Sequence, residues 1–292
     1  MLRILLIALG LAGSVVSAAP WDLPPGVKTL MVNGYPMAYL ERGSGPAIVL
    51  VHGGNSDYRS WKEQISSPPP NFRLITVSLR HYYPERWNGQ GDTFSTPQHA
   101  EDLGAFIQEL AIGPVYLVAH SRGGIVAALV ARSHPDLVKK LVLLEPGFYS
   151  LVRGSVSAQE GGTVAAALRA TAARFEQGDI DGGLEMWADR HVAGSWKRLS
   201  EEDRQRSRDN AWTLIRDMGA SAPVTCSVVG GLTMPLLLMR GEKSPRIYAK
   251  IIDATRHCLP SAELVVIPDA AHAMHRMNPK AFESAMVDFV SR

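Results

Sequence analysis

The stretch LVAHSRGG, residues 117–124, decides the fold class of this chain. It joins an apolar run, VYLVAH at 115–120, to an amphipathic segment, and Ser121 stands at the junction. Gly123 and Gly124 permit a sharp reversal there because they carry no side chain that would obstruct it. In open α/β sheets, ligands bind beyond the carboxyl ends of the strands, which is where Ser121 falls. The stretch therefore predicts a strand, a tight turn that exposes a serine hydroxyl, and a helix.

Further apolar runs alternate with amphipathic stretches along the chain. They are continuous runs of Val, Ile and Leu, typical of parallel strands covered by helices on both faces, and they occupy residues 47–52, 73–79, 140–145, 235–240 and 263–268. Ahead of them, Asn33-Gly34 joins two short runs as a hairpin, because both positions tolerate a positive φ. We therefore expect an α/β fold: a mostly parallel, doubly wound sheet opened by an antiparallel hairpin.

One long interval interrupts the alternation. Residues 148–232 contain helical stretches but no strand-like run, and Ser200 with Asp203 resembles the start of one of those helices. We expect this interval to form a helical cap inserted before the penultimate strand. Residues 28–147 and 233–292 then form the core.

The first residues resemble an export signal. Residues 1–18 contain a charged Arg3, an apolar stretch and a small-residue end at Ser17-Ala18, which together predict a signal peptide cleaved near Ala18. The apolar stretch is shorter than the ~20 residues of a membrane-spanning helix, so no stable membrane anchor is expected. The mature protein is predicted to be periplasmic or secreted.

The chain has two cysteines, Cys226 and Cys258. An oxidising compartment could join them, but the sequence does not say whether their Cα atoms lie within bridging distance. We expect two separate buried thiols, with a disulfide as the alternative.

Composition excludes several classes of function. The chain has 292 residues, of which 46% are hydrophobic and 20% charged, as in soluble globular proteins. Its net charge of +2 is too small to suggest a nucleic-acid partner, and no basic stripe with interleaved aromatics is present. The composition does not address oligomeric state.

The segment Ala119-His120-Ser121-Arg122-Gly123 resembles the nucleophile elbow G-x-S-x-G of the α/β-hydrolase family, with Ala at the first Gly position. The resemblance covers residues 28 to 292. It implies that Ser121 is a nucleophile and that the backbone N–H of Arg122 is one donor of an oxyanion hole.

Two loops extend the resemblance. VHGGN at 51–55 is similar to the family's first oxyanion loop, which makes Gly54 the second donor and brings Gly53 beside the substrate. PDAAHAMHRMNP at 268–279 is similar to the loop that carries the catalytic histidine. The resemblance therefore implies that His272 is the base, which serine needs because its hydroxyl is a poor nucleophile until a neighbour takes its proton.

The acid is where this sequence departs from the commonest family pattern. The usual G-x-x-D segment is replaced by Gly241-Glu242-Lys243-Ser244, and serine cannot hold an imidazolium by charge. Glu145, at the end of the preceding strand, resembles the acid of some family branches, including zearalenone-type lactone hydrolases and a group of haloalkane dehalogenases. We expect Glu145 to be the acid, with Glu242 as the alternative.

The other histidines are expected to have structural roles. His275 lies one helical turn after His272, and without a carboxylate at a known ligand spacing the H-x-x-H pair does not indicate a metal site. His52 and His120 are expected to orient loops through backbone hydrogen bonds. No metal and no cofactor are expected.

These roles predict a serine hydrolase that cleaves carboxylic ester or lactone bonds of a small molecule through an acyl-enzyme. Epoxide hydrolases and haloalkane dehalogenases of the family use aspartate at the elbow, so Ser121 argues against both. Tyr82 follows a strand and is expected to contact substrate. Trp187 is expected to do so from the cap, although packing inside the cap is the alternative. An amidase and a non-catalytic binding module on the same fold remain alternatives.

Overall fold

The structure is a computed structural model that describes residues 20–155, 158–189, 193–220 and 222–292. The predicted signal peptide lies outside the described residues. No helix in the described part of the chain is long and apolar enough to cross a membrane.

The centre of the molecule is an eight-stranded sheet with the order β1-β2-β4-β3-β5-β6-β7-β8. Strand β2 runs antiparallel to both of its neighbours, and all other pairs are parallel. This confirms the mostly parallel sheet opened by a hairpin. The strands are β1 (Lys28–Val32), β2 (Tyr35–Gly43), β3 (Ala47–Val51), β4 (Arg73–Val77), β5 (Val115–His120), β6 (Val138–Leu144), β7 (Leu236–Gly241) and β8 (Glu263–Ile267).

The hairpin turn is the one that the sequence predicts. Asn33 has a φ of 48° and Gly34 a φ of 73°, so both central residues adopt the left-handed conformation that a two-residue turn of type I′ requires. The turn pairs Val32 with Tyr35 and sets the register of the whole hairpin.

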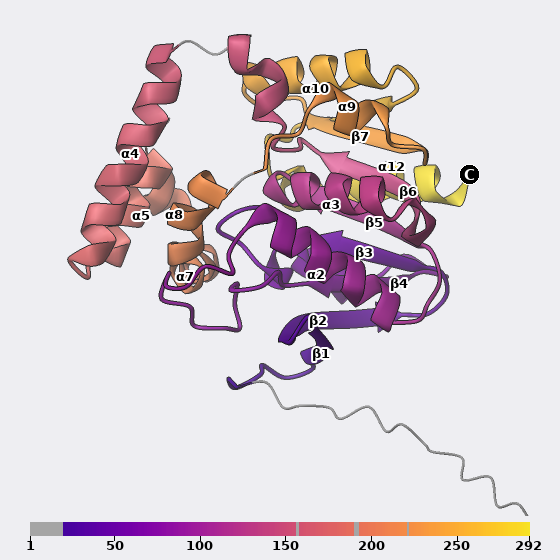
Figure 1. The fold of residues 1–292 in the computed structure, drawn as a ribbon, viewed down its shortest axis with the longest axis horizontal. Helices are drawn as coiled ribbons and strands as arrows, with labels where there is room; N and C mark the ends of the chain where they lie inside the picture. The colour runs from indigo at the N-terminus through magenta and orange to yellow at the C-terminus, as the bar shows by residue number, and fades with distance from the viewer. Residues whose placement is uncertain (1–19, 156–157, 190–192, 221) are drawn as a thin grey trace, which may run out of the picture.

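Helices cover both faces of the sheet (Figure 1). One face packs against α2 (Thr96–Glu109), α3 (Arg122–Ser133) and α10 (Arg246–Cys258) through a large apolar cluster that includes Phe106 and Val126. The other face packs against α1 (Lys62–Ser66) and α12 (Pro279–Ser291) through a second cluster that includes Trp61 and Phe282. Short helices complete the core: η1 (Tyr58–Trp61), η2 (Pro135–Leu137) and α11 (Met274–Met277).

The described part of the interval between β6 and β7 contains helices only. Five of them stand beside the sheet rather than over it in Figure 1: α4 (Ala158–Glu176), α5 (Ile180–Asp189), α6 (Ser195–Arg198), α7 (Glu201–Asp209) and α8 (Ala211–Ala220). They share an apolar cluster of their own, which includes Phe175, Leu184 and Trp196. The flanking helices η3 (Tyr149–Ser155) and α9 (Cys226–Gly230) instead contact α10 of the core.

The predicted helix start at Ser200 is confirmed, because its Oγ accepts a hydrogen bond from Asp203 N at 3.1 Å. The helical region that begins there is divided at Asn210 into α7 and α8, and the Asn210 side chain donates a hydrogen bond to Asp57 of the core.

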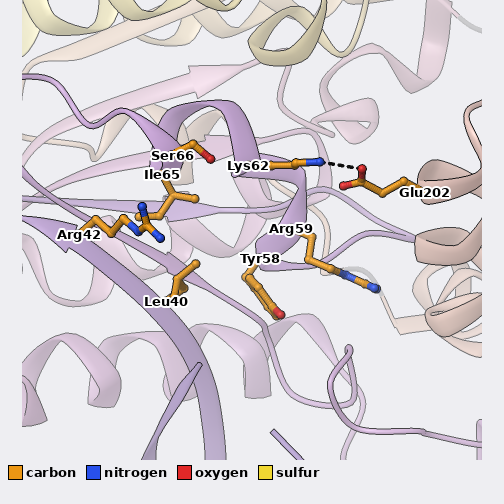
Figure 2. Close-up of a pocket in the computed structure, with 8 residues that line it drawn as sticks. All are labelled: Leu40, Arg42, Tyr58, Arg59, Lys62, Ile65, Ser66 and Glu202. Atoms are coloured by element: carbon orange, nitrogen blue, oxygen red, sulfur yellow. Dashed lines mark hydrogen bonds and ion pairs between the residues drawn. The ribbon is translucent and has the colours of Figure 1, made fainter. Parts of the chain in front are cut away.

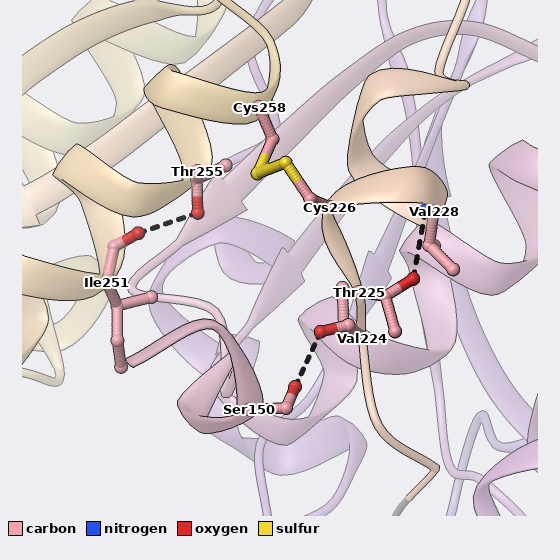
Figure 3. Close-up of a disulfide and its surroundings, with 8 residues drawn as sticks. All are labelled: Ser150, Val224, Thr225, Cys226, Val228, Ile251, Thr255 and Cys258. Atoms are coloured by element: carbon pink, nitrogen blue, oxygen red, sulfur yellow. Dashed lines mark hydrogen bonds between the residues drawn. A yellow bond between two sulfur atoms is a disulfide. The ribbon is translucent and has the colours of Figure 1, made fainter. Parts of the chain in front are cut away.

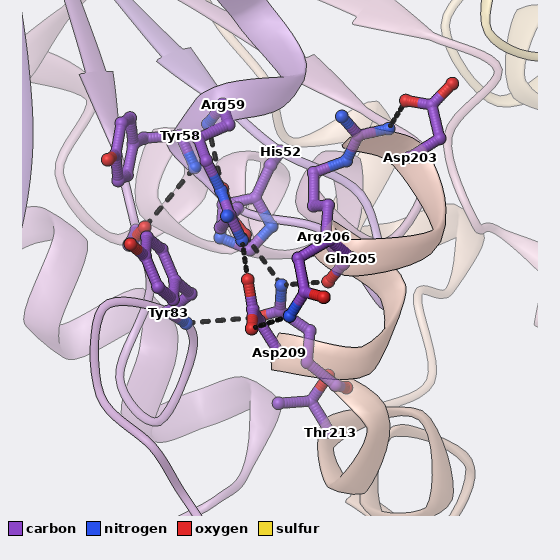
Figure 4. A network of polar contacts seen from close by, with 12 residues as sticks. His52, Tyr58, Arg59, Tyr83, Asp203, Gln205, Arg206, Asp209 and Thr213 are labelled. Carbon is purple, nitrogen blue, oxygen red and sulfur yellow. Dashed lines mark hydrogen bonds and ion pairs between the residues drawn. The ribbon is translucent and has the colours of Figure 1, made fainter. Parts of the chain in front are cut away.

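A polar network fastens α7 to the core (Figure 4). Arg59 pairs with Asp209 at 2.8 Å, and Asn210 Nδ2 donates to Asp57 Oδ2 at 2.6 Å. Asn210 Oδ1 also accepts from the backbone N–H of Tyr83 at 2.9 Å. Because Asp57 and Asn210 are buried, these bonds are poorly replaced by water and hold this part of the cap in one position.

The expectation of two separate thiols is wrong. Cys226 and Cys258 form a disulfide with a Cα–Cα distance of 5.1 Å (Figure 3). Thr225 caps α9 by accepting from Val228 N, which brings Cys226 to the first position of that helix. Cys258 is the last residue of α10. The bond therefore ties the segment that returns from the cap to the helix that follows β7.

Candidate active site

Ser121 sits on a strained turn between β5 and α3. Its φ of 52° and ψ of −119° lie in a region that residues with a side chain rarely adopt, and such strain persists only where surrounding bonds enforce it. Here Ser121 N donates to Leu144 O, and Ser121 O accepts from both Gly124 N and Gly147 N, each at 2.9 Å. The turn lifts the hydroxyl out of the sheet while its backbone is held by three hydrogen bonds.

The two glycines of the elbow are required by close approach. A Cβ on Gly123 would lie 2.3 Å from His52 O, and a Cβ on Gly124 would lie 2.7 Å from Pro146 Cβ. Ala119 is fully buried in β5 opposite Val51, so the family's first Gly position accommodates a methyl group here. The absence of side chains at Gly123 and Gly124 thus lets the start of α3 pack closely against the end of β3 and the loop after β6.

Glu145 and His272 form a hydrogen-bonded pair. Glu145 directly follows β6 and is fully buried. Its Oε2 lies 2.7 Å from His272 Nδ1, and its Oε1 accepts from the backbone N–H of Gly241 at 2.9 Å. An ionised carboxylate can only accept, so Nδ1 carries the proton and Nε2 presents a lone pair.

Glu242, the alternative acid, lies elsewhere. It is exposed, and its Oε2 accepts from the backbone N–H of Asp269 at 3.0 Å, which makes it a loop-bracing group. The geometry thus brings Glu145, and not Glu242, to His272.

The Nε2 atom of His272 faces a tyrosine. Tyr248 of α10 stacks on the imidazole at a centroid distance of 4.4 Å and an interplanar angle of 16°, and its hydroxyl lies 3.3 Å from Nε2. Among the described residues, the Ser121 hydroxyl makes no hydrogen bond in this conformation. Ser121 and His272 are neighbours through His120, whose Nε2 donates to His272 O at 2.9 Å and whose ring lies 4.5 Å from the His272 ring.

His52 orients a loop through backbone hydrogen bonds, as the sequence predicts, and His275 is buried. His52 Nε2 accepts from Leu79 N at 3.1 Å, so its Nδ1 donates to Gly53 O at 2.7 Å and braces the oxyanion loop. Burial lowers the pKa of His52 to about 4. His275 packs on Trp61 at a centroid distance of 4.4 Å and on His120 at 4.8 Å, and burial lowers its pKa well below the usual range.

The two predicted oxyanion donors, Arg122 and Gly54, lie on the helix start and on the loop that adjoin the serine. Arg122 begins α3, where the first backbone N–H groups have no partner within the helix and attract negative charge. A Cβ on Gly53 would lie 3.3 Å from Ser121 Cβ, so the backbone of the β3 loop passes directly against the nucleophile. Gly54 follows on the same loop. This arrangement can stabilise negative charge that develops on an oxygen bound beside Ser121.

A buried polar cluster lies against this oxyanion loop. The Arg122 guanidinium pairs with Asp217 of α8 and donates to His99 Nδ1 at 2.8 Å. Tyr82 donates its hydroxyl to Asp217 at 3.0 Å. A Cβ on Gly54 would lie only 2.8 Å from Asp217 Oδ2. The cap therefore delivers a carboxylate to the edge of the predicted oxyanion hole, where burial raises the pKa of Asp217 to about 6.

Tyr82 and Trp187 differ in their surroundings. Tyr82 is fully buried and belongs to the Arg122 cluster. Trp187 packs against the apolar cluster of the cap, which is the alternative stated for it. Contact of either residue with substrate stays a prediction.

A surface pocket of about 160 Å³ lies outside this site (Figure 2). Lys62 and Glu202 form an ion pair of 2.7 Å at its border. The other lining residues come from β2, η1 and α1, and none of them is a predicted site residue: Leu40, Arg42, Tyr58, Arg59, Ile65 and Ser66. Within the described residues, no group of three or more His, Cys, Asp or Glu side chains could hold a metal ion.

Comparison of the chain with known protein families identifies the family to which it belongs. A model of the alpha/beta hydrolase fold matches residues 46–279. The chain belongs to the alpha/beta hydrolase family. A 2-(acetamidomethylene)succinate hydrolase from Mesorhizobium japonicum is 24% identical over 86% of this chain and 90% of its own length. A pimeloyl-[acyl-carrier protein] methyl ester esterase from Vibrio vulnificus is 25% identical over 86% of this chain and 96% of its own.

A solved structure shares the same fold. It is a thermophilic esterase from Thermogutta terrifontis, which is 20% identical and superposes with a TM-score of 0.71 over 91% of this chain and 97% of that one.

Two residues of this alpha/beta hydrolase were missed by the sequence analysis. Asp217 is the only acidic residue of AWTLIRDMGA, an otherwise largely apolar helix. A single carboxylate in such a helix could have indicated a buried charge with a specific partner. Tyr248 lies in the first turn of the helix that follows Gly241-Glu242-Lys243-Ser244. Its nearness to the vacant acid segment was the only hint.

Proposed function

We propose that this alpha/beta hydrolase cleaves carboxylic ester or lactone bonds of small molecules by means of Ser121, His272 and Glu145. The observation that carries the proposal is the 2.7 Å contact between His272 Nδ1 and the buried Glu145, next to the strained elbow of Ser121. That contact fixes the tautomer in which Nε2 can accept a proton.

The proposed reaction has two halves. Ser121 Oγ attacks the carbonyl carbon while His272 Nε2 takes its proton, and the backbone N–H groups of Gly54 and Arg122 bind the oxyanion. The imidazolium then gives its proton to the leaving oxygen as the C–O bond breaks. Water, deprotonated by Nε2, hydrolyses the acyl-enzyme in the same way.

The nature of the elbow residue supports ester chemistry. A serine forms an acyl-enzyme with a carbonyl substrate, and its base needs a ring nitrogen that can accept the serine proton, which the contact of Nδ1 with Glu145 leaves to Nε2. The methyl ester esterase among the relatives is consistent with this reaction class. A lactone is a cyclic ester and places the same demands on the site.

We also propose that the protein is exported before it acts. The disulfide between Cys226 and Cys258 supports this, because such bonds persist in oxidising compartments and are rare in the cytosol.

The test combines a covalent probe with a substrate panel. A fluorophosphonate should label the protein, and Ser121→Ala should abolish labelling. A panel of esters, lactones and amides graded by acyl size should then show turnover of esters or lactones. An unlabelled, folded protein would identify a non-catalytic binding module instead, and turnover confined to amides would identify an amidase.

A further inference from the structure

Tyr248 lies beside the catalytic nitrogen of the proposed reaction but has no role in that reaction so far. Its hydroxyl lies 3.3 Å from His272 Nε2, the nitrogen that must first receive the serine proton and then deliver it to the leaving oxygen. We propose that Tyr248 is a further catalytic residue, which donates a hydrogen bond to the leaving-group oxygen. This inference rests on the proposed ester hydrolysis.

The direction of the hydrogen bond follows from the tautomer. Glu145 holds the proton of His272 on Nδ1, so Nε2 can only accept and Tyr248 must donate to it. The hydroxyl of Tyr149 lies 3.1 Å from that of Tyr248. Because Tyr248 uses its own hydrogen on Nε2, the bond between the two tyrosines runs from Tyr149 to Tyr248. A donor at its oxygen makes the Tyr248 hydrogen a better donor in turn.

The same hydrogen can reach the leaving oxygen. To accept a proton from Nε2, that oxygen must come within about 3 Å of it. Tyr248 Oη lies 3.3 Å from the same nitrogen, on the face of the imidazole that its ring covers, so the proposal places the leaving oxygen at the edge of the imidazole and beside this hydroxyl. Ser121 then takes the place of Tyr248 at Nε2 during attack, and Tyr248 turns its hydrogen to the leaving oxygen.

The proton balance does not involve Tyr248 itself. The serine proton moves to Nε2 and then to the leaving oxygen, as the bond from the carbonyl carbon to that oxygen breaks. Tyr248 keeps its proton throughout and stabilises the negative charge that develops on the oxygen before protonation is complete.

The surrounding fold holds the phenol in place. Tyr149 lies four residues after Glu145, on helix η3, which packs against α10. The last residue of α10 is fixed by the disulfide of Cys258. Stacking on His272 restrains the Tyr248 ring. Tyr149, Tyr248 and His272 are therefore attached to three different segments: η3, α10 and the loop after β8. The Tyr248 hydroxyl can turn without movement of the backbone.

The distinguishing experiment varies the leaving group. Wild type, Tyr248→Phe and Tyr149→Phe are compared on p-nitrophenyl, phenyl and alkyl esters of one acyl group, with kcat/KM as the measure of acylation. Tyr248→Phe keeps the stacked ring and loses only the hydroxyl. We expect kcat/KM to fall about tenfold or more for the alkyl ester, and less than about twofold for the p-nitrophenyl ester, whose leaving group departs without assistance. Tyr149→Phe should show the same trend with a smaller effect.

Controls separate the possible failures. Tyr116→Phe removes the hydroxyl of a largely buried tyrosine elsewhere in the sheet and should leave the turnover of all three esters unchanged. Equal losses on every ester would reduce Tyr248 to a structural support for His272, and no loss on any ester would remove it from the reaction; either result overturns the inference. Wild-type protein that fails to react with the fluorophosphonate would overturn the proposed function instead.

Discussion

The two carboxylate oxygens of Glu145 have different hydrogen-bond partners. Oε1 is tied to the backbone of Gly241 on the neighbouring strand, and Oε2 faces His272. The carboxylate therefore cannot rotate without losing a bond in a fully buried place, where an unsatisfied charge is costly. The residue after β6 is therefore held in one orientation by bonds to two different segments.

The two candidate acids can be compared directly. Glu145→Gln keeps the size of the side chain but presents an amide to His272, which favours the wrong tautomer, so kcat should fall by about 10²–10⁴. Glu242→Gln removes a charge from an exposed loop and should change kcat by less than about twofold. Initial rates on a short-chain p-nitrophenyl ester measure both. The reverse ranking would assign the acid to Glu242.

Gly53 tests how closely the oxyanion loop approaches the nucleophile. In Gly53→Ala the new Cβ would lie 2.8 Å from His120 Nδ1 and 3.3 Å from Ser121 Cβ, so one of them must shift. Displacement of reacting groups by about 1 Å can cost 10²-fold in rate, and we expect a loss of that order in kcat/KM. Gly154→Ala, where a Cβ would meet no atom of the described residues within 4 Å, is the control. Activity of Gly53→Ala equal to that control would contradict the close approach.

At the scale of elements, α8 and α3 meet through a charge pair. Asp217 comes from the cap, and Arg122 begins the helix of the elbow. Burial raises the pKa of Asp217 to about 6 from its usual 3.8, which means that the folded protein holds this proton more tightly than the unfolded chain does. The stabilisation is therefore complete below pH 3.8 and is lost as the pH rises through 6.

Asp217→Asn removes this titration. Its stability relative to wild type should improve between pH 4 and pH 7, by up to about 3 kcal/mol, because only wild type must ionise a buried carboxyl over that interval. Urea unfolding of both proteins at the two pH values provides the comparison. A constant difference in unfolding free energy across this range would show that Asp217 titrates normally.

The helices and strands differ in how well the sequence predicts the positions of their residues. The strand pattern predicts that Ser121, Glu145 and His272 lie at one edge of the sheet, because each follows an apolar run and the ends of parallel strands meet there. Their predicted roles came from the resemblance to the family. Asp217 and Tyr248 lie on helices, and their contacts depend on how those helices turn against the core. No local pattern encodes that rotation. The division of the cap helix at Asn210 was missed for the same reason, since its cause is a bond to Asp57.

At the scale of the whole molecule, the disulfide connects the segment that returns from the cap to the helix that follows β7. Cys226 lies where the chain returns from the cap, and Cys258 ends α10. The sequence could not decide between pairing and separate thiols, because the 5.1 Å between their Cα atoms depends on α9 packing beside α10. The bond also restrains the helix that carries Tyr248.

Removal of the disulfide should lower the stability of the fold while hydrolytic activity is largely kept. The bond closes a loop with a sequence separation of 32 residues, so Cys226→Ser with Cys258→Ser should lower the free energy of unfolding by about 3–4 kcal/mol through the freedom gained by the unfolded chain. Denaturant titrations with and without dithiothreitol measure the effect. The reductant should destabilise wild type and leave the double variant unchanged. Hydrolysis of a p-nitrophenyl ester at 25 °C should persist in the variant, since the bond touches neither Ser121 nor His272. A reductant effect of equal size in both proteins would mean that the two cysteines are not paired in solution.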